Sequence, residues 1–209
     1  MCHSDDDGLR LPPRIAPQQV VIIPVVPKPE LEEAVLSYAK DVADRLKGIS
    51  VHIDKRDRRG GEKNWEWIKK GIPVRIEVGP RDIDSQSVMV ARRDHPHKQK
   101  EKVGIDQLPE HVPAVLEEIQ KNYYSQALSY RDAHLRSDLT TFEELEHFFS
   151  HSEGGFVQAK WCGELETEKL LEPLKLTMRC LPLVQSQTEG SCILTGKPAT
   201  LDVILAKAY

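Results

Sequence analysis

Apolar residues recur along the chain with the two spacings that strands and helices require. A continuous apolar run over 18–26 predicts a strand that is buried on both faces of an α/β sheet. Apolar residues at three- and four-residue steps from Leu31 to Leu46 predict an amphipathic helix that ends at Gly48. Alternation over 49–54 predicts a second strand. This order favours a mixed β-sheet flanked by helices.

The stretch from Gly71 to Asp94 carries the densest pattern of charges. Apolar residues at every second position over 74–78 predict a strand, and a second apolar run over 88–91 predicts its partner. If the strands pair, we expect the charged residues that face or follow them to gather at one loop end of the sheet. These residues are Glu77, Arg81, Asp82, Arg92 and Arg93. Such a mixture of donors and acceptors suits the edges of unstacked RNA bases, and a salt-bridged sheet rim is the alternative.

Further helices and strands are predicted on both sides of this stretch. A short helix is expected over 64–70, and a long one from about 109 towards Leu135. Thr141 and Glu144 match a capping box and predict a helix through Phe149. Beyond it, the pattern predicts strands over 156–161, 177–182 and 203–209, a charged helix through Leu171 and a knuckle-like turn over 190–198. The chain after about residue 137 therefore forms a second, small α+β module.

Three polar segments are predicted to be loops. Residues 1–17 combine three consecutive aspartates with Pro12, Pro13 and Pro17, which favours a turn and then an extended linker. The basic segment 55–63 contains no glycine-rich phosphate fingerprint, so it is a charged loop or a contact for a phosphate backbone. The segment 95–102 is predicted to be a solvated basic loop. His95 and His97 could bind a metal ion at this spacing, but no companion cysteine lies nearby, so we discount a metal site there.

Composition limits the class of protein. The chain has 209 residues, of which 39% are hydrophobic and 30% charged, as in one large or two small globular domains. No apolar run approaches a membrane span, and the N-terminus lacks a signal peptide pattern. Four scattered cysteines favour a reducing cytoplasm. The net charge of −4 argues against a protein that coats nucleic acid with positive charge, but it allows a local basic face.

Two of the cysteines precede turns of the kind found in zinc knuckles. They are Cys162 and Cys192, and the natural places for a second pair hold Thr167 and Thr195. A structural zinc site needs four ligands. We therefore predict no metal site. Cys180 lies in an apolar stretch and is expected to pack as a small hydrophobe.

Taken in order, these segments resemble the C-terminal part of the prolyl-tRNA synthetase family, in its archaeal and eukaryotic-like type. The resemblance covers essentially the whole chain. It is carried by H-S-D-D-D-G-L-R-L-P-P-R-I-A-P, Q-V-V-I-I-P-V, K-G-I-P-V-R-I-E-V-G-P-R-D, A-R-R-D, F-V-Q-A-K-W-C-G, T-M-R-C-L-P, C-I-L-T-G-K-P-A and A-K-A-Y.

The resemblance implies a division into three parts and a nucleic-acid ligand. Residues 1–17 would end a catalytic domain, 18–122 would form an anticodon-binding domain of the class II synthetase fold, and 123–209 would add a bridging helix and a domain like a zinc-binding one. The sheet would bind the proline anticodon, whose two shared bases are guanines. Glu77 and Asp82 would accept from guanine edges, while Arg81, Arg92 and Arg93 would contact guanine O6 and N7 or phosphates. Trp65 and Trp67 would stack on bases or, alternatively, pack in the core and at its edge.

The resemblance also implies what this chain does not contain. The family's zinc site uses four cysteines at the positions of Cys162, Thr167, Cys192 and Thr195, so half of the ligands are absent. The motifs that bind ATP, Mg²⁺ and proline lie in a catalytic domain upstream of Met1. We therefore expect this chain to be inactive alone, without a cofactor of its own, and to have that domain as a partner. Tyr209 would pack towards it. The full-length enzyme would be a homodimer, whereas the oligomeric state of this piece stays open.

Two other functions remain as alternatives. The chain could be a stand-alone, non-catalytic RNA-binding or regulatory paralogue, which a stop codon upstream of Met1 would support. A small-molecule-binding α/β domain is the third, and the absence of a glycine-rich phosphate fingerprint weighs against it.

Overall fold

The computed structural model describes residues 3–151 and 154–207, which divide into two compact units. Unit 1 covers 1–126 and unit 2 covers 127–209. The finer division at 17/18 and 122/123 stays a prediction, and Tyr209 lies outside the described residues. No helix in the described part is long and apolar enough to cross a membrane.

Unit 1 is built on a five-stranded mixed sheet with the strand order β4-β3-β5-β6-β7. β4 and β5 run parallel to β3, whereas β6 is antiparallel to β5 and β7 is antiparallel to β6. The strands are β3 (Val20–Pro24), β4 (Val51–Ile53), β5 (Val74–Val78), β6 (Ser87–Arg92) and β7 (Glu101–Gly104). The helices are η1 (Pro29–Leu31), α1 (Glu32–Arg45), α2 (Gly60–Lys69), α3 (Pro80–Asp84), η2 (Ile105–Gln107) and α4 (Leu108–Ala133), which continues past Gln126.

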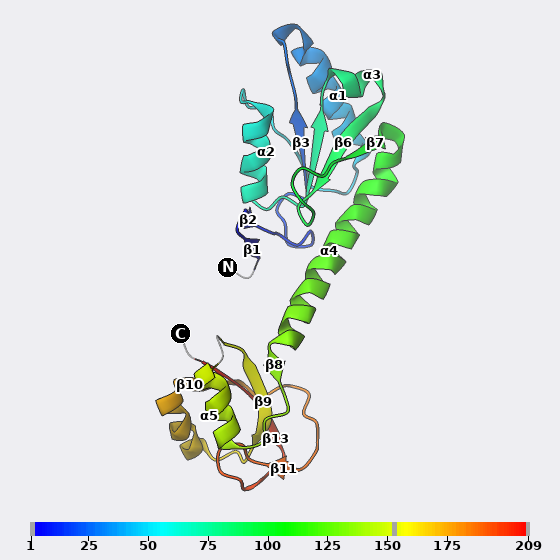
Figure 1. Ribbon diagram of the computed structural model, residues 1–209. Coiled ribbons are helices and arrows are strands. Elements are labelled where there is room, and N and C mark those ends of the chain that lie inside the picture. Colours follow the sequence, from blue (N-terminus) through cyan, green and yellow to red (C-terminus); the bar gives the residue numbers. More distant parts are fainter. Residues whose placement is uncertain (1–2, 152–153, 208–209) are drawn as a thin grey trace. The chain divides into compact units, whose positions relative to one another are not determined.

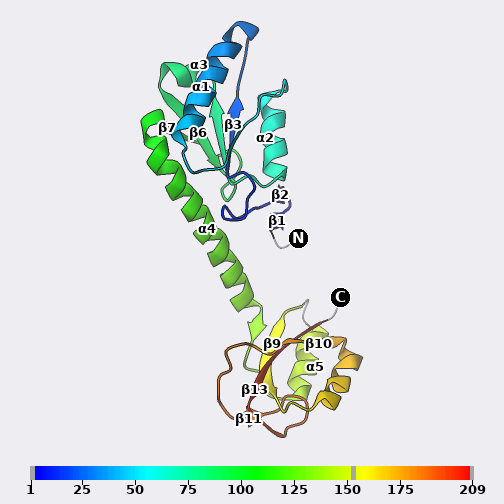
Figure 2. The ribbon, with the colours of Figure 1, turned by 180° about the vertical axis from the view of Figure 1, so that it is seen from behind.

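The two faces of this sheet differ in how much apolar surface they bury. On one face, alternate residues of β3, β5 and β6 pack with α1 and the first part of α4 in a large core that includes Val20, Ile76 and Ile119. On the other face, α2 contributes to a small cluster of Val21, Ile23, Trp67 and Ile72. Figures 1 and 2 show α1 and α2 on either side of the strands. The positions that continue this second face across β5 are Arg75 and Glu77, so the face becomes polar there.

Unit 2 contains a four-stranded sheet with the order β10-β13-β9-β8. The long antiparallel pair of β9 and β13 forms its centre, and α5 packs against it through Leu145 and Phe149. Its elements are β8 (Leu135–Arg136), α5 (Phe142–His151), β9 (Phe156–Trp161), η3 (Leu165–Leu174), β10 (Leu176–Cys180), β11 (Gly190–Ser191), β12 (Pro198–Ala199) and β13 (Leu201–Lys207).

The predicted α/β fold, with a mixed sheet flanked by helices and a small second domain, is confirmed. α1 ends earlier than predicted: its last residue is Arg45 and its C-cap is Leu46, while Gly48 lies in the turn that follows, with a left-handed φ of 81°. The predicted capping box is confirmed. Before α5, the Thr141 and Glu144 side chains each accept from the other residue's backbone N–H.

Three local predictions are wrong. The segment 55–63 is not entirely a loop, because α2 begins at Gly60, four residues before the predicted helix. The segment 95–102 is not entirely a loop, because Glu101 and Lys102 belong to β7 and complete the sheet edge beside β6. Cys180 is exposed at the end of β10, because the pairing with β13 shifts at a bulge between Met178 and Cys180, so Cys180 leaves the side of the strand on which Leu176 and Met178 pack.

The N-terminal segment is also more ordered than an extended linker. β1 (Ser4–Asp5) and β2 (Gly8–Leu9) form a hairpin, and Pro12 and Pro13 are buried. The hairpin lies so close to the end of α2 that glycine is needed on both sides. A Cβ atom at Gly8 would lie 2.7 Å from the Lys69 backbone, and one at Gly71 would lie 2.6 Å from the Leu9 carbonyl carbon. The hairpin is therefore part of unit 1.

Candidate nucleic-acid interface

The charged residues predicted to meet at one loop end lie at two opposite ends of the β5–β6 pair. The strands are antiparallel, and Val74 at the start of β5 is opposite Arg92 at the end of β6. Arg81 and Asp82 follow the other end of β5, in α3. The prediction of a single cluster is therefore wrong. In an antiparallel pair, the end of the second strand lies beside the start of the first strand, not beside its end.

At the α3 end, Arg81 is exposed and Asp82 is half-buried. The Asp82 carboxylate accepts from the Gly79 backbone N–H at 2.9 Å and so caps α3. Burial raises the pKa of Asp82 from its ordinary value. The Arg81 side chain has no hydrogen bond or ion pair within the part of the chain that the structure describes. This end therefore presents a guanidinium group that is free to bind a ligand.

At the other end, Arg92 and Arg93 point to opposite faces and have protein partners. Arg92 donates to both carboxylate oxygens of Asp94, at 3.0 and 2.9 Å, and to Glu118 of α4 at 2.6 Å. Burial opposes ionisation of Asp94, but hydrogen bonds from Arg92 and Asn122 outweigh it and lower the pKa of Asp94. These contacts join the end of β6 to α4.

Arg93 is 6% exposed and lies beneath the N-terminal hairpin. It donates to the Leu9 and Ile68 carbonyl oxygens, at 2.9 and 3.2 Å, and to both oxygens of the Asp5 carboxylate, at 2.9 and 2.5 Å. The hydrogen bond from Arg93 lowers the pKa of Asp5. Asp5 is thus the partner of a buried cation.

Between the two ends, Glu77 lies on the polar face of β5 with Asn64 of α2. Asn64 Nδ2 donates to Glu77 Oε1, and Asn64 Oδ1 accepts from Arg75 Nε at 3.2 Å. Lys100 Nζ, from the exposed hairpin loop, donates to both Glu77 oxygens at 2.7 Å. Asn64 therefore joins a carboxylate and a guanidinium group on one face of the sheet.

Arg75 is the residue that the sequence analysis missed. It is 1% exposed, and its Nη1 atom is buried without a hydrogen-bond partner in the described part of the chain. Burial, and next the charge of Arg93, lower the pKa of Arg75 to about 10. An arginine between two apolar residues of an interior strand was the available signal. A buried N–H donor without an acceptor is costly, so a ligand or water that accepts from Nη1 would stabilise Arg75.

Arg75 lines a polar cavity of about 250 Å³ beneath the 93–97 segment. The other lining residues are Asp5, Asp7, Arg10, Ile68, Arg92, Arg93, Asp94, His95, Pro96 and His97. Trp65 stands nearby: it is 38% exposed, and its ring meets that of His97 at 5.9 Å between centroids. Trp67 is buried and donates to Asp54 at 2.8 Å. Of the two tryptophans, Trp65 is the one with an accessible ring.

The basic loop after β4 borders a second hollow, of about 380 Å³, with the segment that follows β3. Arg56 binds the buried Asp54 and also Glu66, and the buried Lys63 donates to the Asp54 carbonyl oxygen at 3.1 Å. Hydrogen bonds from Arg56, and then from Trp67, strongly lower the pKa of Asp54. Lys55 and Arg59 are exposed. Asp54 thus fixes a loop whose other cations face solvent.

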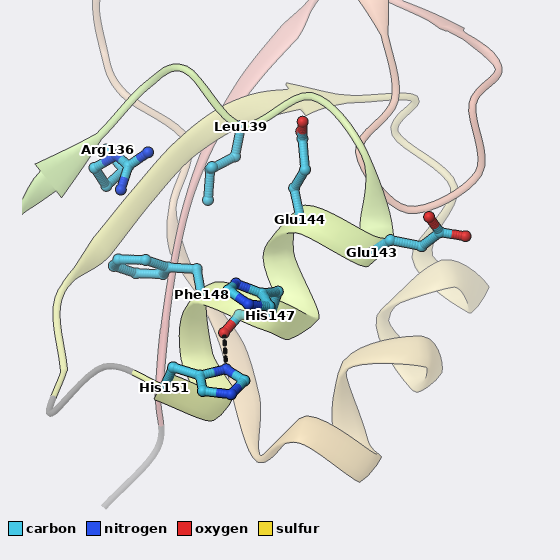
Figure 3. Close-up of a pocket in the computed structure, with 7 residues that line it drawn as sticks. All are labelled: Arg136, Leu139, Glu143, Glu144, His147, Phe148 and His151. Carbon is cyan, nitrogen blue, oxygen red and sulfur yellow. Dashed lines mark hydrogen bonds between the residues drawn. The ribbon is translucent and has the colours of Figure 1, made fainter.

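Unit 2 has a hollow of about 580 Å³ beside α5 (Figure 3). Its lining residues are Arg136, Leu139, Glu143, Glu144, His147, Phe148 and His151. Glu144 caps α5, Arg136 pairs with Asp138, and the His151 Nδ1 atom lies 2.9 Å from the His147 carbonyl oxygen. These polar contacts serve α5 and the turn before it.

Comparison with known proteins assigns both units. Residues 19–114 match the anticodon binding domain family, and residues 143–209 match the family described as prolyl-tRNA synthetase, C-terminal. Unit 1 is therefore an anticodon-binding domain. The chain as a whole corresponds to the C-terminal part of the prolyl-tRNA synthetase family, as the sequence predicts.

Full-chain relatives carry the name of that enzyme. The chain is 57% identical to a proline–tRNA ligase of Protochlamydia amoebophila and 41% identical to those of Akkermansia muciniphila and Bdellovibrio bacteriovorus. Each match covers all of this chain but only 43–44% of the relative. The chain thus spans less than half the length of the curated relatives that it matches.

Proposed function

We propose that this chain recognises the anticodon of a proline tRNA as the C-terminal part of a prolyl-tRNA synthetase. The observation that carries the proposal is that Asn64 joins the Glu77 carboxylate to the Arg75 guanidinium group within the matched anticodon-binding domain. A guanine presents N–H donors and the acceptors O6 and N7, so a carboxylate beside a guanidinium group whose Nη1 atom has no partner complements it. Lys100, on the exposed loop, is the partner of Glu77 that a base would displace.

The other predicted contacts fit this proposal to different degrees. Arg81 offers an exposed cation for a guanine or a phosphate, and Asp82 lies beside it as an acceptor. Arg92 and Arg93 have carboxylate partners, so we propose that they keep these partners and stabilise the site instead of binding RNA. Trp65 would supply a stacking surface.

The remaining parts of the proposal concern the longer protein. A catalytic domain upstream would ligate proline to its tRNA with ATP and Mg²⁺, in the cytoplasm and as a homodimer. That domain would be the second partner of this chain. A reading frame that continues upstream of Met1 would support this proposal, and a stop codon there would favour the stand-alone RNA-binding paralogue.

Binding measurements with two RNAs test the recognition step. One is a proline tRNA transcript and the other carries adenines in place of both anticodon guanines. We expect the unmodified chain to prefer the first, and Glu77→Gln to reduce that preference about tenfold, since one good base contact contributes roughly 1–3 kcal/mol. Glu77→Gln keeps the acceptor for Asn64, so the fold is retained.

Glu62→Gln is the matched control, because Glu62 is an exposed residue of the same helix that carries Asn64. It should leave the preference unchanged. Equal binding of both RNAs by the unmodified chain, at low and at moderate salt, would contradict anticodon recognition by this chain.

A further inference from the structure

Two cysteines of unit 2 lie together at the end of β9. Cys162 follows that strand directly, and Cys192 follows β11. The Ile193 backbone N–H donates to the Lys160 carbonyl oxygen at 2.9 Å, which holds the turn after Cys192 against the strand. The Gly196 N–H donates to the Cys192 carbonyl oxygen at 2.8 Å and closes the turn. The chain around Cys192 is thus fixed beside Cys162.

The two sulfur atoms share one polar environment. The Thr195 hydroxyl lies 3.9 Å from Cys162 Sγ and is also within hydrogen-bonding reach of the Cys192 thiol. Burial opposes ionisation of Cys192, but hydrogen bonding from Thr195, Leu194 and Cys162 outweighs it and lowers the pKa of the Cys192 thiol. Cys192 is 1% exposed, whereas Cys162 is half-buried.

The surrounding residues do not complete a zinc site. Thr167, at one of the two remaining positions, accepts from Trp161 Nε1 at 2.9 Å and donates to the Glu164 carbonyl oxygen at 2.7 Å. Its hydroxyl is therefore already used within the protein. Within residues 3–151 and 154–207, no three histidine, cysteine or acidic side chains are placed to hold a metal ion. Two thiols fall short of the four ligands of a structural zinc.

We propose that Cys162 and Cys192 form a reversible disulfide with a low-molecular-weight disulfide as the oxidant. The more accessible Cys162 thiolate attacks the small disulfide, forms a mixed disulfide and releases one small thiolate. The Cys192 thiolate then attacks the Cys162 sulfur, and the second small thiolate leaves. Two protein thiols are oxidised, one disulfide is reduced to two thiols, and the two protons pass to the released thiolates.

The disulfide would join the turn after Cys192 covalently to the end of β9. It would thus take the structural role that a metal ion has in a zinc knuckle. In the cytoplasm proposed above, the dithiol is the resting form, and oxidant load moves the pair to the disulfide. Cys180 provides an internal comparison, because it is an exposed thiol at the end of β10.

Oxidised glutathione is the probe for a direct test on the complete 209-residue chain. After reaction, free thiols are blocked with N-ethylmaleimide and the chain is analysed by intact mass and by peptide mapping. We expect a peptide cross-linked between Cys162 and Cys192, with a loss of about 2 Da from that pair for the two hydrogens removed. Dithiothreitol should reverse it. Cys180 should instead carry a glutathione adduct.

Variants sharpen the outcome. Cys162→Ser and Cys192→Ser should each abolish the cross-link, whereas Cys180→Ser should form it as the unmodified chain does. The peptide map of the unmodified chain tests the proposed disulfide even if a variant fails to fold. A stable glutathione adduct on Cys162, unmodified thiols at both positions, or a cross-link to a different cysteine would overturn the proposal.

Discussion

Both ends of the β5–β6 pair carry arginine and aspartate side chains, but these side chains differ in exposure and in their protein partners. At one end, Arg81 is exposed and has no protein partner in the described part of the chain, while Asp82 caps α3. At the other end, Arg92 and Arg93 are held by Asp94, Glu118 and Asp5. The comparison teaches that an arginine followed by an aspartate can be a ligand contact or a structural ion pair, depending on what the fold packs over it.

The largest expected effect on stability comes from removing the buried Asp94 carboxylate, at the end of the pair where the arginines have protein partners. Asp94→Ala leaves Arg92 without its bidentate partner, and we expect the free energy of unfolding to fall by about 3 kcal/mol, as for a broken buried ion pair. Urea unfolding followed by tryptophan fluorescence measures it. Asp84→Ala, at an exposed position of α3, is the control and should change stability little. Equal losses for the two variants would remove the contrast between the ends.

Arg93 tests the same end from its other face. Arg93→Lys keeps the charge but loses the fork that binds Asp5 and two carbonyl oxygens together, so we expect a loss of about 2 kcal/mol in unfolding free energy. The same urea titration measures it. Lys121→Arg, on the exposed side of α4, changes the same two residue types in reverse and should be neutral. A neutral Arg93→Lys would mean that charge alone matters here.

The pH dependence of stability should separate Asp5 from solvated carboxylates. Because Arg93 lowers the pKa of Asp5 in the folded state, its contribution is complete above the unfolded-state pKa and is lost as pH falls through the folded-state pKa. Asp5 is partly exposed, so we expect Asp5→Asn to cost only about 0.5–1 kcal/mol at pH 7. The difference from the unmodified chain should begin to narrow as pH falls below the ordinary aspartate pKa of about 3.9 and should close below the lowered pKa of the folded state. Asp6→Asn is the control, and a difference that did not depend on pH would contradict the ion pair.

The smallest effect on stability is expected at the other end of the pair, where Arg81 is exposed. Arg81→Gln should change the free energy of unfolding by less than about 0.5 kcal/mol, as for an exposed residue without partners. If Arg81 contacts a phosphate, the variant should weaken binding of both RNAs alike and reduce the slope of log affinity against log salt by about 1. If it contacts a guanine, the preference between the RNAs should fall instead. A destabilised variant with unchanged RNA binding would reverse the comparison.

Much of the fold follows from periodicity, whereas the site depends on contacts between distant segments. The apolar run of β3 and the spacing in α1 are local patterns, and both elements form as predicted. β7 was missed because Glu101 and Lys102 lie on an exposed sheet edge, where no alternation is required. The partners of Arg93 could not be predicted, since Asp5 lies 88 residues away in the sequence.

The resemblance located the functional stretch but not the state of each side chain in it. Glu77 was named as an acceptor from its place in the motif, but its link through Asn64 to Arg75 needed the packing of α2 on β5. Arg75 itself was passed over because an alternating strand usually exposes its polar positions. Here the opposite face is also covered, and the arginine is buried with an unsatisfied donor.

The hairpin that packs on α2 also decides how this domain can be excised for separate study. The matched anticodon-binding region begins at residue 19, so a fragment designed from the family match alone would start there. Such a fragment would lose Asp5 and the Leu9 carbonyl group, and Arg93 would become an uncompensated cation beside Arg75. It would also expose the close-packed surface at Gly71. A soluble fragment should therefore begin no later than Ser4, fifteen residues before the homology boundary suggests.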